Sequence, residues 1–398
     1  MPSISSKAVR VPASAIRKLS PYSDAAERSG VKVYHLNIGA PDIDSPASAV
    51  EAVKNFDFRH LEYSNSAGIY ELREAMVNKY YRKLGINLSL EDLLITTAGS
   101  EALAFTVETV CNDGDDIMVI EPFYINYYSI AYQYGVEVKA VHTDIRNGFK
   151  VPGIEAFEAA LTPKTKALLV CNPSNPTGTL YSKEDMILIG EFCKKHDLFL
   201  ISDEVYREFC YTDEPYFSVM NIPGLEQNAI LVDSVSKRYN LCGARIGCIA
   251  TKNAEVLAAI TKFAQARLCA PVLGQIATLG AIDAPASYFE EVKAEYIKRR
   301  NFTIDALNKI PGVFTPMPDG AFYTLAELPV EDADDFAKWM LTDFRMDNET
   351  IMLTPAASFY RTEGIGKNQV RIAYVLETEE LAKAMKILEE GLKAYNAL

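Results

Sequence analysis

The sequence has few of the residues that build metal centres, disulfide frameworks or membrane spans. Its four histidines lie far apart and its seven cysteines never stand in CxxC spacing, so no metal site is expected. An odd number of scattered cysteines also argues against a disulfide framework and favours a reducing compartment, which predicts a cytoplasmic protein. The longest uncharged run, residues 268–282, is interrupted by Pro271 and two glycines and is too short to cross a bilayer.

Positive charge is scarce as well. The chain has 40 Lys and Arg residues against 53 Asp and Glu residues, a formal net charge of −13. Nucleic acids and anionic membranes are recognised by clustered cations, so neither is an expected partner. Residues 1–23 are the exception, because they contain four basic residues and no acid. This pattern favours an ordered arm packed on the body or on a partner subunit, with a transit peptide as the alternative.

What is present is typical of a globular protein that binds small molecules. The 398 residues suffice for two domains, since single domains most often have roughly 100–150 residues. Hydrophobic residues make up 49% and charged residues 23%, far from the composition of a disordered chain. The sequence therefore predicts two folded domains and a small-molecule ligand.

Short β-rich runs alternate with helical stretches from about residue 90. Apolar strands are predicted at residues 93–97, 117–120, 136–141, 167–171, 198–201, 229–232 and 246–249. This alternation predicts an α/β fold, a mostly parallel sheet flanked by helices. A capping box from Ser182 to Asp185 marks one helix start. From about Ala284, a long charged helix (287–308) and shorter elements ending in an amphipathic helix (378–395) predict a smaller α+β domain.

Polar residues follow several of these strands, at the sheet edge where ligands of parallel sheets bind. Gly99-Ser100-Glu101 joins a strand to a helix start and suits a phosphate, although an N-cap serine is the simpler interpretation. The loop at residues 172–178, NPSNPTG, is rigid enough to hold the amide of Asn175 in place, or is only a turn. Asp203 ends another strand and requires a cation or hydrogen bonds there, either within the protein or on a ligand.

A lysine among hydroxyl groups follows the strand at 229–232. Lys237 stands after Ser234 and eight residues before Arg245, a setting that can lower an amine's pKa and make it nucleophilic. Arg245 suits a phosphate. Alone, such a lysine is usually a solvated surface residue. The spacing also matches the SxxK motif of acyl-serine enzymes, but neither SDN nor KTG occurs in the chain.

Three motifs in this order carry a resemblance to a known family. NPxNPTG at residues 172–178, SDEVY at 202–206 and SxSKxxxxxGxRxG at 234–247 together resemble the fold type I pyridoxal-phosphate enzymes. Within that group the chain is similar to the class I aminotransferases, and most closely to the aspartate aminotransferases. The likeness implies the PLP-dependent transferase fold type I. The expected division is an arm and part of the small domain at 1–44, a large cofactor-binding domain at 45–290 and a small domain at 291–398.

The resemblance implies roles at the ring of pyridoxal 5'-phosphate. Lys237 would bind the cofactor aldehyde through its amine and later carry the Cα proton of the substrate. Asp203 would pair with the ring nitrogen and keep it protonated. Tyr206 and Asn175 would hydrogen-bond the ring oxygen, and Tyr124 would stack on the ring.

It also implies how the phosphate is bound. The backbone at Ser100 and Glu101, together with Ser234 and Arg245, would hold this group. Tyr63 matches a tyrosine that reaches the phosphate of the neighbouring subunit. The expected assembly is therefore a homodimer with shared active sites.

For the substrate, the resemblance implies an exchange of the amino group between an L-amino acid and a 2-oxo acid by a ping-pong cycle. Arg371 would clamp the α-carboxylate, with Asn175 beside it and Gly39 leaving room. Some aspartate aminotransferases read the distal carboxylate with a lysine on the phosphate turn, where this chain has Ser100, and others with an arginine of the partner subunit, for which Arg267 is a weak match. Aspartate and 2-oxoglutarate are expected, with aromatic, alanine or broad-range substrates as alternatives.

Other activities remain open at this point. A pyridoxal-phosphate-dependent carbon–sulfur β-lyase would use the same Asn-Asp-Tyr-Lys-Arg set. An acyl-serine enzyme would need Ser234 as its nucleophile. A non-catalytic regulator built on this fold would need a DNA-binding module, for which an acidic chain with fewer than ~40 residues before Gly39 offers no room.

Overall fold

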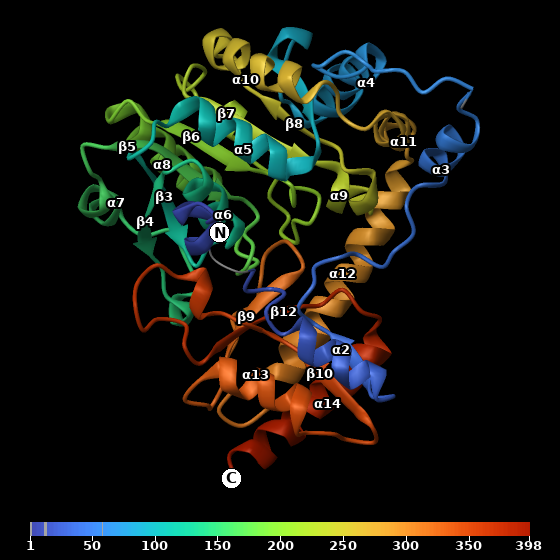
Figure 1. The fold of residues 1–398 in the computed structure, drawn as a ribbon, viewed down its shortest axis with the longest axis vertical. Coiled ribbons are helices and arrows are strands. Elements are labelled where there is room, and N and C mark those ends of the chain that lie inside the picture. The colour runs from blue at the N-terminus through green and yellow to red at the C-terminus, as the bar shows by residue number, and fades with distance from the viewer. Residues whose placement is uncertain (1, 12–13, 58) are drawn as a thin grey trace.

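A seven-stranded sheet in the order β2-β8-β7-β6-β5-β3-β4 forms the centre of the larger part of the molecule (Figure 1). The computed structural model describes residues 2–11, 14–57 and 59–398. Strand β8 runs opposite to the other six strands, which share one direction, so the prediction of a mostly parallel sheet is confirmed. The strands are β2 (Leu93–Thr96), β3 (Asp116–Glu121), β4 (Glu137–His142), β5 (Thr165–Cys171), β6 (Phe199–Asp203), β7 (Ala229–Ser234) and β8 (Gly247–Ala250).

Both faces of this sheet are covered. On β3, Ile117 and Val119 belong to one hydrophobic core, whereas Met118 and Ile120 belong to the other. Side chains alternate between the faces of a strand, so uninterrupted apolar strands require helices on both sides. One core includes α5 (Ala98–Val110), α6 (Asn126–Gln133) and α10 (Ala254–Arg267), and the other includes α3 (Ala47–Lys54), α4 (Tyr70–Ala75), α7 (Ile154–Ala160), α8 (Lys183–Lys195), α9 (Val235–Arg238) and α11 (Val272–Ile282).

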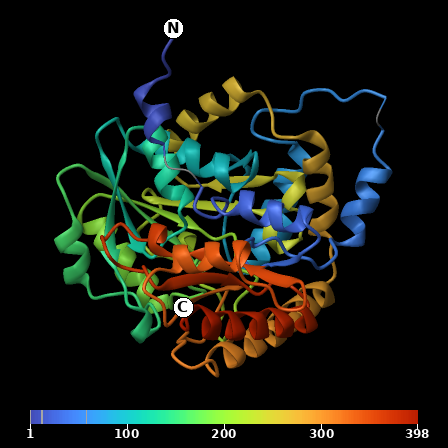
Figure 2. The ribbon, with the colours of Figure 1, turned by 60° about the horizontal axis from the view of Figure 1, so that its bottom comes forward.

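Two small sheets form the rest of the body, which comes forward in Figure 2. Strand β1 (Lys32–His35) pairs with β10 (Glu349–Met352), and the antiparallel order β11-β12-β9 joins β11 (Thr354–Pro355), β12 (Gln369–Ala373) and β9 (Tyr323–Glu327). Around them lie α2 (Ser20–Arg28), α13 (Ala333–Thr342) and α14 (Thr378–Tyr395). The β1–β10 pair joins the N-terminal part of the chain to the C-terminal part. The domain boundaries stay a prediction, and residues 1, 12 and 13 of the expected arm lie outside the described residues.

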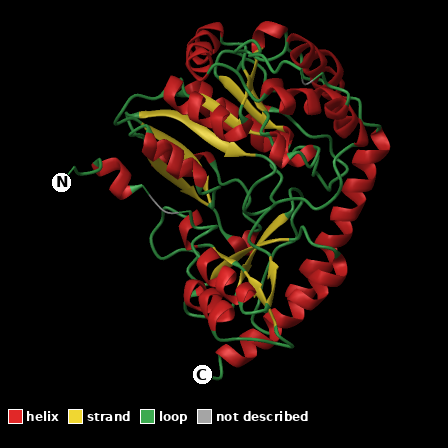
Figure 3. Cartoon of the chain, turned by 45° about the vertical axis from the view of Figure 1, so that its right-hand side comes forward, coloured by secondary structure: helices red, strands yellow, loops and turns green. Residues whose placement is uncertain are grey.

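Local sequence signals set several helix ends. The capping box is confirmed, since the Asp185 N–H donates to Ser182 Oγ (3.0 Å) and the Ser182 N–H donates to Asp185 Oδ2 (2.9 Å). The predicted charged helix is α12 (Ala286–Leu307), a long helix that runs from the large sheet toward α14 (Figure 3). Glycine Gly312 follows it with a φ of +81°, a conformation that residues with a Cβ rarely adopt.

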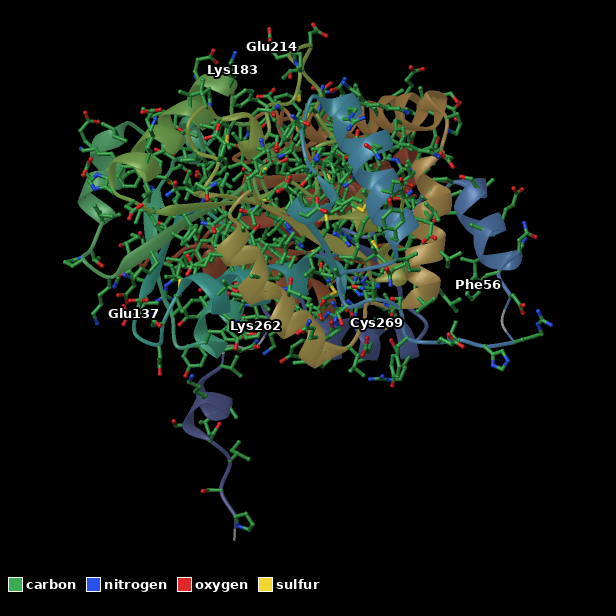
Figure 4. The ribbon with its side chains drawn as sticks, turned by 90° about the horizontal axis from the view of Figure 1, so that it is seen from above. Phe56, Glu137, Lys183, Glu214, Lys262 and Cys269 are labelled. Carbon is green, nitrogen blue, oxygen red and sulfur yellow. The ribbon has the colours of Figure 1, made fainter. Side chains whose placement is uncertain are left out.

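The N-terminal segment projects from the body. Helix α1 (Ser6–Arg10) extends away from the other elements in Figures 3 and 4, and Ile4 and Val9 are exposed by 73% and 67%. Its contact with the body includes a hydrogen bond from Lys7 Nζ to the carbonyl of Gln133 (3.4 Å). Within the described ranges, no helix is both long and apolar enough to cross a membrane, and no cluster of three His, Cys, Asp or Glu side chains could hold a metal ion.

Candidate functional site

A cavity of about 570 Å³ lies at the carboxyl ends of the large sheet, and Tyr323 of β9 and Arg371 of β12 line it from one of the small sheets. Its wall takes Asp203 from the end of β6, Ser234 from the end of β7 and Arg371 from β12. This is the edge where ligands of parallel sheets bind. Ten of the twelve residues predicted from the sequence line the cavity: Gly39, Ser100, Tyr124, Asn175, Asp203, Tyr206, Ser234, Lys237, Arg245 and Arg371.

The other two predicted residues do not line it. The carboxylate of Glu101 accepts a hydrogen bond from the N–H of Thr97 (2.7 Å) and lies 3.4 Å from Arg267, so its side chain fixes the start of α5. Arg267 is thereby paired within its own chain and is also absent from the cavity wall. Tyr63 is 80% exposed and lies on the segment that follows α3, beyond the residue Phe56 labelled in Figure 4.

Asp203 is a buried carboxylate without a cationic partner. Tyr127 Oη donates to its Oδ2 (2.8 Å) and the N–H of Val205 donates to its Oδ1 (3.3 Å). No Lys, Arg or His side chain forms an ion pair with it in the part of the chain that the structure describes. Burial therefore outweighs the two hydrogen bonds and raises its pKa from 3.8 to about 6. The buried ion pair within the protein, one sequence-based interpretation of Asp203, is not what the structure contains.

Lys237 is not a solvated surface lysine. It stands on the short helix α9, and its Nζ donates to the carbonyl of Gly39 (2.6 Å) and lies 3.9 Å from Cys242 Sγ. Burial is the main cause that lowers its pKa, and the positive charges of Arg371 and Arg245 lower it further against an opposing effect of Cys242. A lowered pKa increases the fraction of neutral amine at a given pH, which is the nucleophilic form.

Arg371 is a buried guanidinium that also has no ionic partner. Its side chain is 1% exposed and donates to Asn175 Oδ1 (3.0 Å) and to the carbonyl of Asn37 (2.5 Å). Its Nε has no partner, and no carboxylate among the described residues forms an ion pair with it. Planar N–H donors at a cavity wall, with no acid paired to them, suit a carboxylate that arrives with a ligand.

Tyr206, Asn175 and Tyr323 form a hydrogen-bonded group beside Arg371. Asn175 Nδ2 donates to Tyr206 Oη (3.4 Å), which lies 3.1 Å from Tyr323 Oη. The Tyr323 ring also packs under the guanidinium of Arg371, at 4.6 Å from its centroid. A Cβ at Gly39 would stand 1.7 Å from Tyr323 Oη, so only glycine fits there without moving this ring.

The turn before α5 and the strand end of β7 lie next to each other. A Cβ at Gly99 would stand 3.7 Å from the Cβ of Ser234, and the Ser234 hydroxyl accepts from the N–H of Ser236 (3.2 Å). Ser100 stands in the first turn of α5, whereas Thr97 occupies the N-cap position, so the N-cap interpretation of Ser100 is wrong. Arg245 is exposed, has a φ of +57° and forms no ion pair within the described residues. Backbone N–H groups of a helix start beside a free arginine suit a phosphate.

The sequence reasoning gave no site role to Tyr127, which hydrogen-bonds Asp203, or to the cavity-wall residues Tyr323 and Arg17. Tyr127, which supports Asp203 from behind, follows Tyr124 by three residues on α6, a spacing that brings helical side chains together. Tyr323 lines the cavity from β9 and belongs to no predicted motif. Arg17 was noted as part of the basic N-terminal segment but without a role at the site.

Comparisons with known proteins agree with this geometry. The family model described as aminotransferase class I and II matches residues 31–388. The aspartate aminotransferase of Pyrococcus horikoshii is 30% identical over 91% of each chain, and the aromatic-amino-acid aminotransferase 2 of Thermococcus litoralis is 30% identical over 96% of each. The structure of aspartate aminotransferase from Thermus thermophilus with maleate is 28% identical, covers 98% of this chain and all of that chain, and has a TM-score of 0.89. The chain therefore belongs to the class I and II aminotransferases and is a transaminase.

Proposed function

We propose that this transaminase holds pyridoxal 5'-phosphate in the cavity and moves an amino group between aspartate and 2-oxoglutarate. The observation that carries the proposal is a pair of buried charges, Asp203 and Arg371, that the described residues leave without ionic partners. A buried charge of this kind is costly unless a ligand supplies its counter-charge. The cofactor supplies a cationic ring nitrogen for Asp203, and the amino acid supplies a carboxylate for Arg371.

The residues around the cavity fit this cofactor. Its protonated ring draws electrons from the substrate Cα and makes the Cα–H bond acidic. A cationic ring nitrogen beside Asp203 would lower the raised pKa of this carboxyl group and keep it ionised. The ionised carboxylate would in turn hold the proton on the ring nitrogen. Tyr206, Asn175 and Tyr124 line the cavity, where the first two would hydrogen-bond the ring oxygen and Tyr124 would pack on the ring.

Lys237 has two tasks. Its amine, with a pKa lowered by burial, would hold the cofactor at the aldehyde carbon. The same amine would act as the base that moves the Cα proton of the substrate. Its hydrogen bond to the Gly39 carbonyl holds the amine inside the cavity (2.6 Å).

Binding at the two ends of the cavity orients the reacting bond. Ser234, Arg245 and the backbone N–H groups at Ser100 and Glu101 hold the phosphate. Arg371 binds the α-carboxylate of the substrate, with Asn175 fixing the guanidinium from one side (3.0 Å). Orientation of this type contributes much of the rate of an enzyme reaction.

We also infer that the active unit is a homodimer with shared sites. Tyr63 is 80% exposed, and α1 projects from the body with apolar side chains exposed. Exposed apolar side chains on an ordered arm are suited to a protein interface. A second copy of the chain would cover them and bring Tyr63 to the partner's phosphate.

The test is a single half-reaction with the reconstituted enzyme. Addition of aspartate without an oxo acid is expected to convert the visible band of the aldehyde form into that of the amine form and to release one equivalent of oxaloacetate per site. 2-Oxoglutarate should then restore the first spectrum. No spectral change with any amino acid would overturn the proposal, and continuous pyruvate release from a cysteine conjugate without an oxo acid would favour a β-lyase instead.

A further inference from the structure

The cavity wall contains a fourth cationic side chain that the proposed function does not use. Arg17 lies between α1 and α2, and it lines the cavity together with Ser14 and Ile16 of the same segment. The Arg17 N–H donates to the carbonyl of Ser14 (3.0 Å), so this segment turns at the cavity wall. No ion pair of Arg17 occurs among the described residues, whereas the next residue, Lys18, pairs with Asp334.

Arg17 lines the same cavity as Arg371, the residue proposed for the substrate α-carboxylate. The phenol of Tyr124 experiences the positive charges of both Arg371 and Arg17, although burial is the main influence on it and raises its pKa. Arg371 is buried, while Arg17 is exposed, so the first stands inside the cavity and the second at its mouth. A ligand bound by Arg371 therefore shares its cavity with Arg17.

The cavity wall has more cationic than anionic side chains. The cationic side chains of the wall are Arg17, Lys237, Arg245 and Arg371, against the single carboxylate of Asp203. In the proposed function, Lys237 binds the aldehyde of the cofactor, Arg245 binds its phosphate, and Arg371 binds the α-carboxylate of the substrate. One cation therefore remains for one further anionic group of the ligand.

We propose that Arg17 is the residue that selects dicarboxylic substrates, by pairing with the carboxylate at the far end of the side chain. This inference rests on the proposed function. It assigns recognition of the distal carboxylate, which the sequence left open, to a residue of the same subunit. The weak alternative, Arg267, is paired with Glu101 within its own chain, and Ser100 carries no charge. Arg17 brings planar donors to the cavity wall.

The experiment compares the holoenzyme with its Arg17→Gln variant. Binding of succinate and of butyrate is measured by titration calorimetry, and kcat/KM is measured with 2-oxoglutarate and with pyruvate. Loss of one charge-assisted pair is expected to weaken succinate binding and kcat/KM for 2-oxoglutarate by about 10- to 100-fold. Values for butyrate and pyruvate should change less than about 2-fold, because their single carboxylate is bound by Arg371. Arg17→Lys should restore part of the selectivity.

Arg28→Gln serves as the matched control, since Arg28 is an exposed arginine of the same region that does not line the cavity. It should leave all four values unchanged. Equal losses for mono- and dicarboxylic ligands in Arg17→Gln, or no loss at all, would overturn the role of Arg17. If the wild-type enzyme completes the half-reaction only with monocarboxylic amino acids, this inference fails while cofactor chemistry stands. Absence of any half-reaction defeats the proposed function itself.

Discussion

Two groups of buried charges lie beside each other in this molecule, and they differ in whether the protein itself supplies their counter-charges. The paired cluster consists of Glu204, Arg207, Asp233 and Arg238, and the cavity charges are Asp203, Lys237 and Arg371. Asp203 and Glu204 are adjacent in sequence, as are Lys237 and Arg238. One member of each adjacent pair joins the cluster and the other lines the cavity.

Every charge of the paired cluster has a counter-charge within the protein. Arg238 Nη2 lies 2.5 Å from both oxygens of Asp233, and Arg207 Nη2 lies 3.2 Å from Asp233 and 3.3 Å from Glu204. Burial opposes the ionisation of Asp233, but the two arginines outweigh it and hold its pKa below the usual value. Tyr81 Oη adds a hydrogen bond to the same carboxylate (2.8 Å).

The cavity charges show the opposite balance to that of Asp233. Burial raises the pKa of Asp203 to about 6 and lowers that of Lys237, because neither group meets a counter-charge within the described residues. The same strand ends thus hold a self-sufficient cluster and a set of charges that a ligand must complete. This difference distinguishes residues that support the fold from residues that bind and react.

The largest effect is expected from Lys237→Ala, which removes the reacting amine from the cavity charges. Transamination should fall by about 10⁴-fold, near the upper end of what a positioned general base supplies. The visible band of the bound cofactor should be lost, which absorption spectra measure. Lys183→Ala, at an exposed lysine labelled at the outer edge in Figure 4, is the control and should behave as wild type. An unchanged spectrum in Lys237→Ala would contradict the assignment.

Breaking the paired cluster should instead cost stability. Asp233→Asn leaves Arg207 and Arg238 buried with too little negative charge, and the free energy of unfolding should fall by about 3–5 kcal/mol. Urea denaturation at fixed protein concentration measures this loss. Asp213→Asn, at an exposed aspartate, should change it by less than about 0.5 kcal/mol. A stable Asp233→Asn variant with impaired cofactor binding would show that Asp233 belongs with the cavity charges and not with the paired cluster.

Arg371→Ala should act on substrate and spare the cofactor. Because the α-carboxylate loses a bidentate partner, the dissociation constant for aspartate analogues should rise by about 100-fold. Affinity for pyridoxal phosphate should change little, and both constants can be read from spectral titrations of one sample. Release of the cofactor by Arg371→Ala would show that this arginine belongs to cofactor binding rather than to the substrate clamp.

Much of the fold could be predicted from the sequence because its signals are local. Apolar runs such as residues 167–171 marked β5, and the amphipathic helix at 378–395 was predicted at its observed bounds. The order of the motifs also predicted that the site residues of the large sheet lie close together, since the strand ends of a parallel sheet meet at one edge.

The parts that were missed depend on contacts between distant segments. Tyr323 reaches Tyr206 only because β9 of a small sheet lies beneath the cavity, and Arg17 reaches the wall through a turn before α2. Neither contact has a periodic pattern. Whether a buried charge is paired also depends on such contacts, so the sequence alone left Asp203 undecided between an internal ion pair and a ligand.

The most direct test of this account is the pH dependence of stability in the apoprotein of Asp203→Asn. The folded pKa of Asp203 (about 6) is above its unfolded value (3.8), so its ionisation destabilises the fold as pH rises through this interval. Near pH 7 the variant should be more stable than wild type by roughly 3 kcal/mol, with little difference near pH 4, and should bind pyridoxal phosphate more weakly. A variant that is several kcal/mol less stable at about pH 7, with unchanged cofactor affinity, would contradict the claim that a ligand supplies the counter-charge of Asp203.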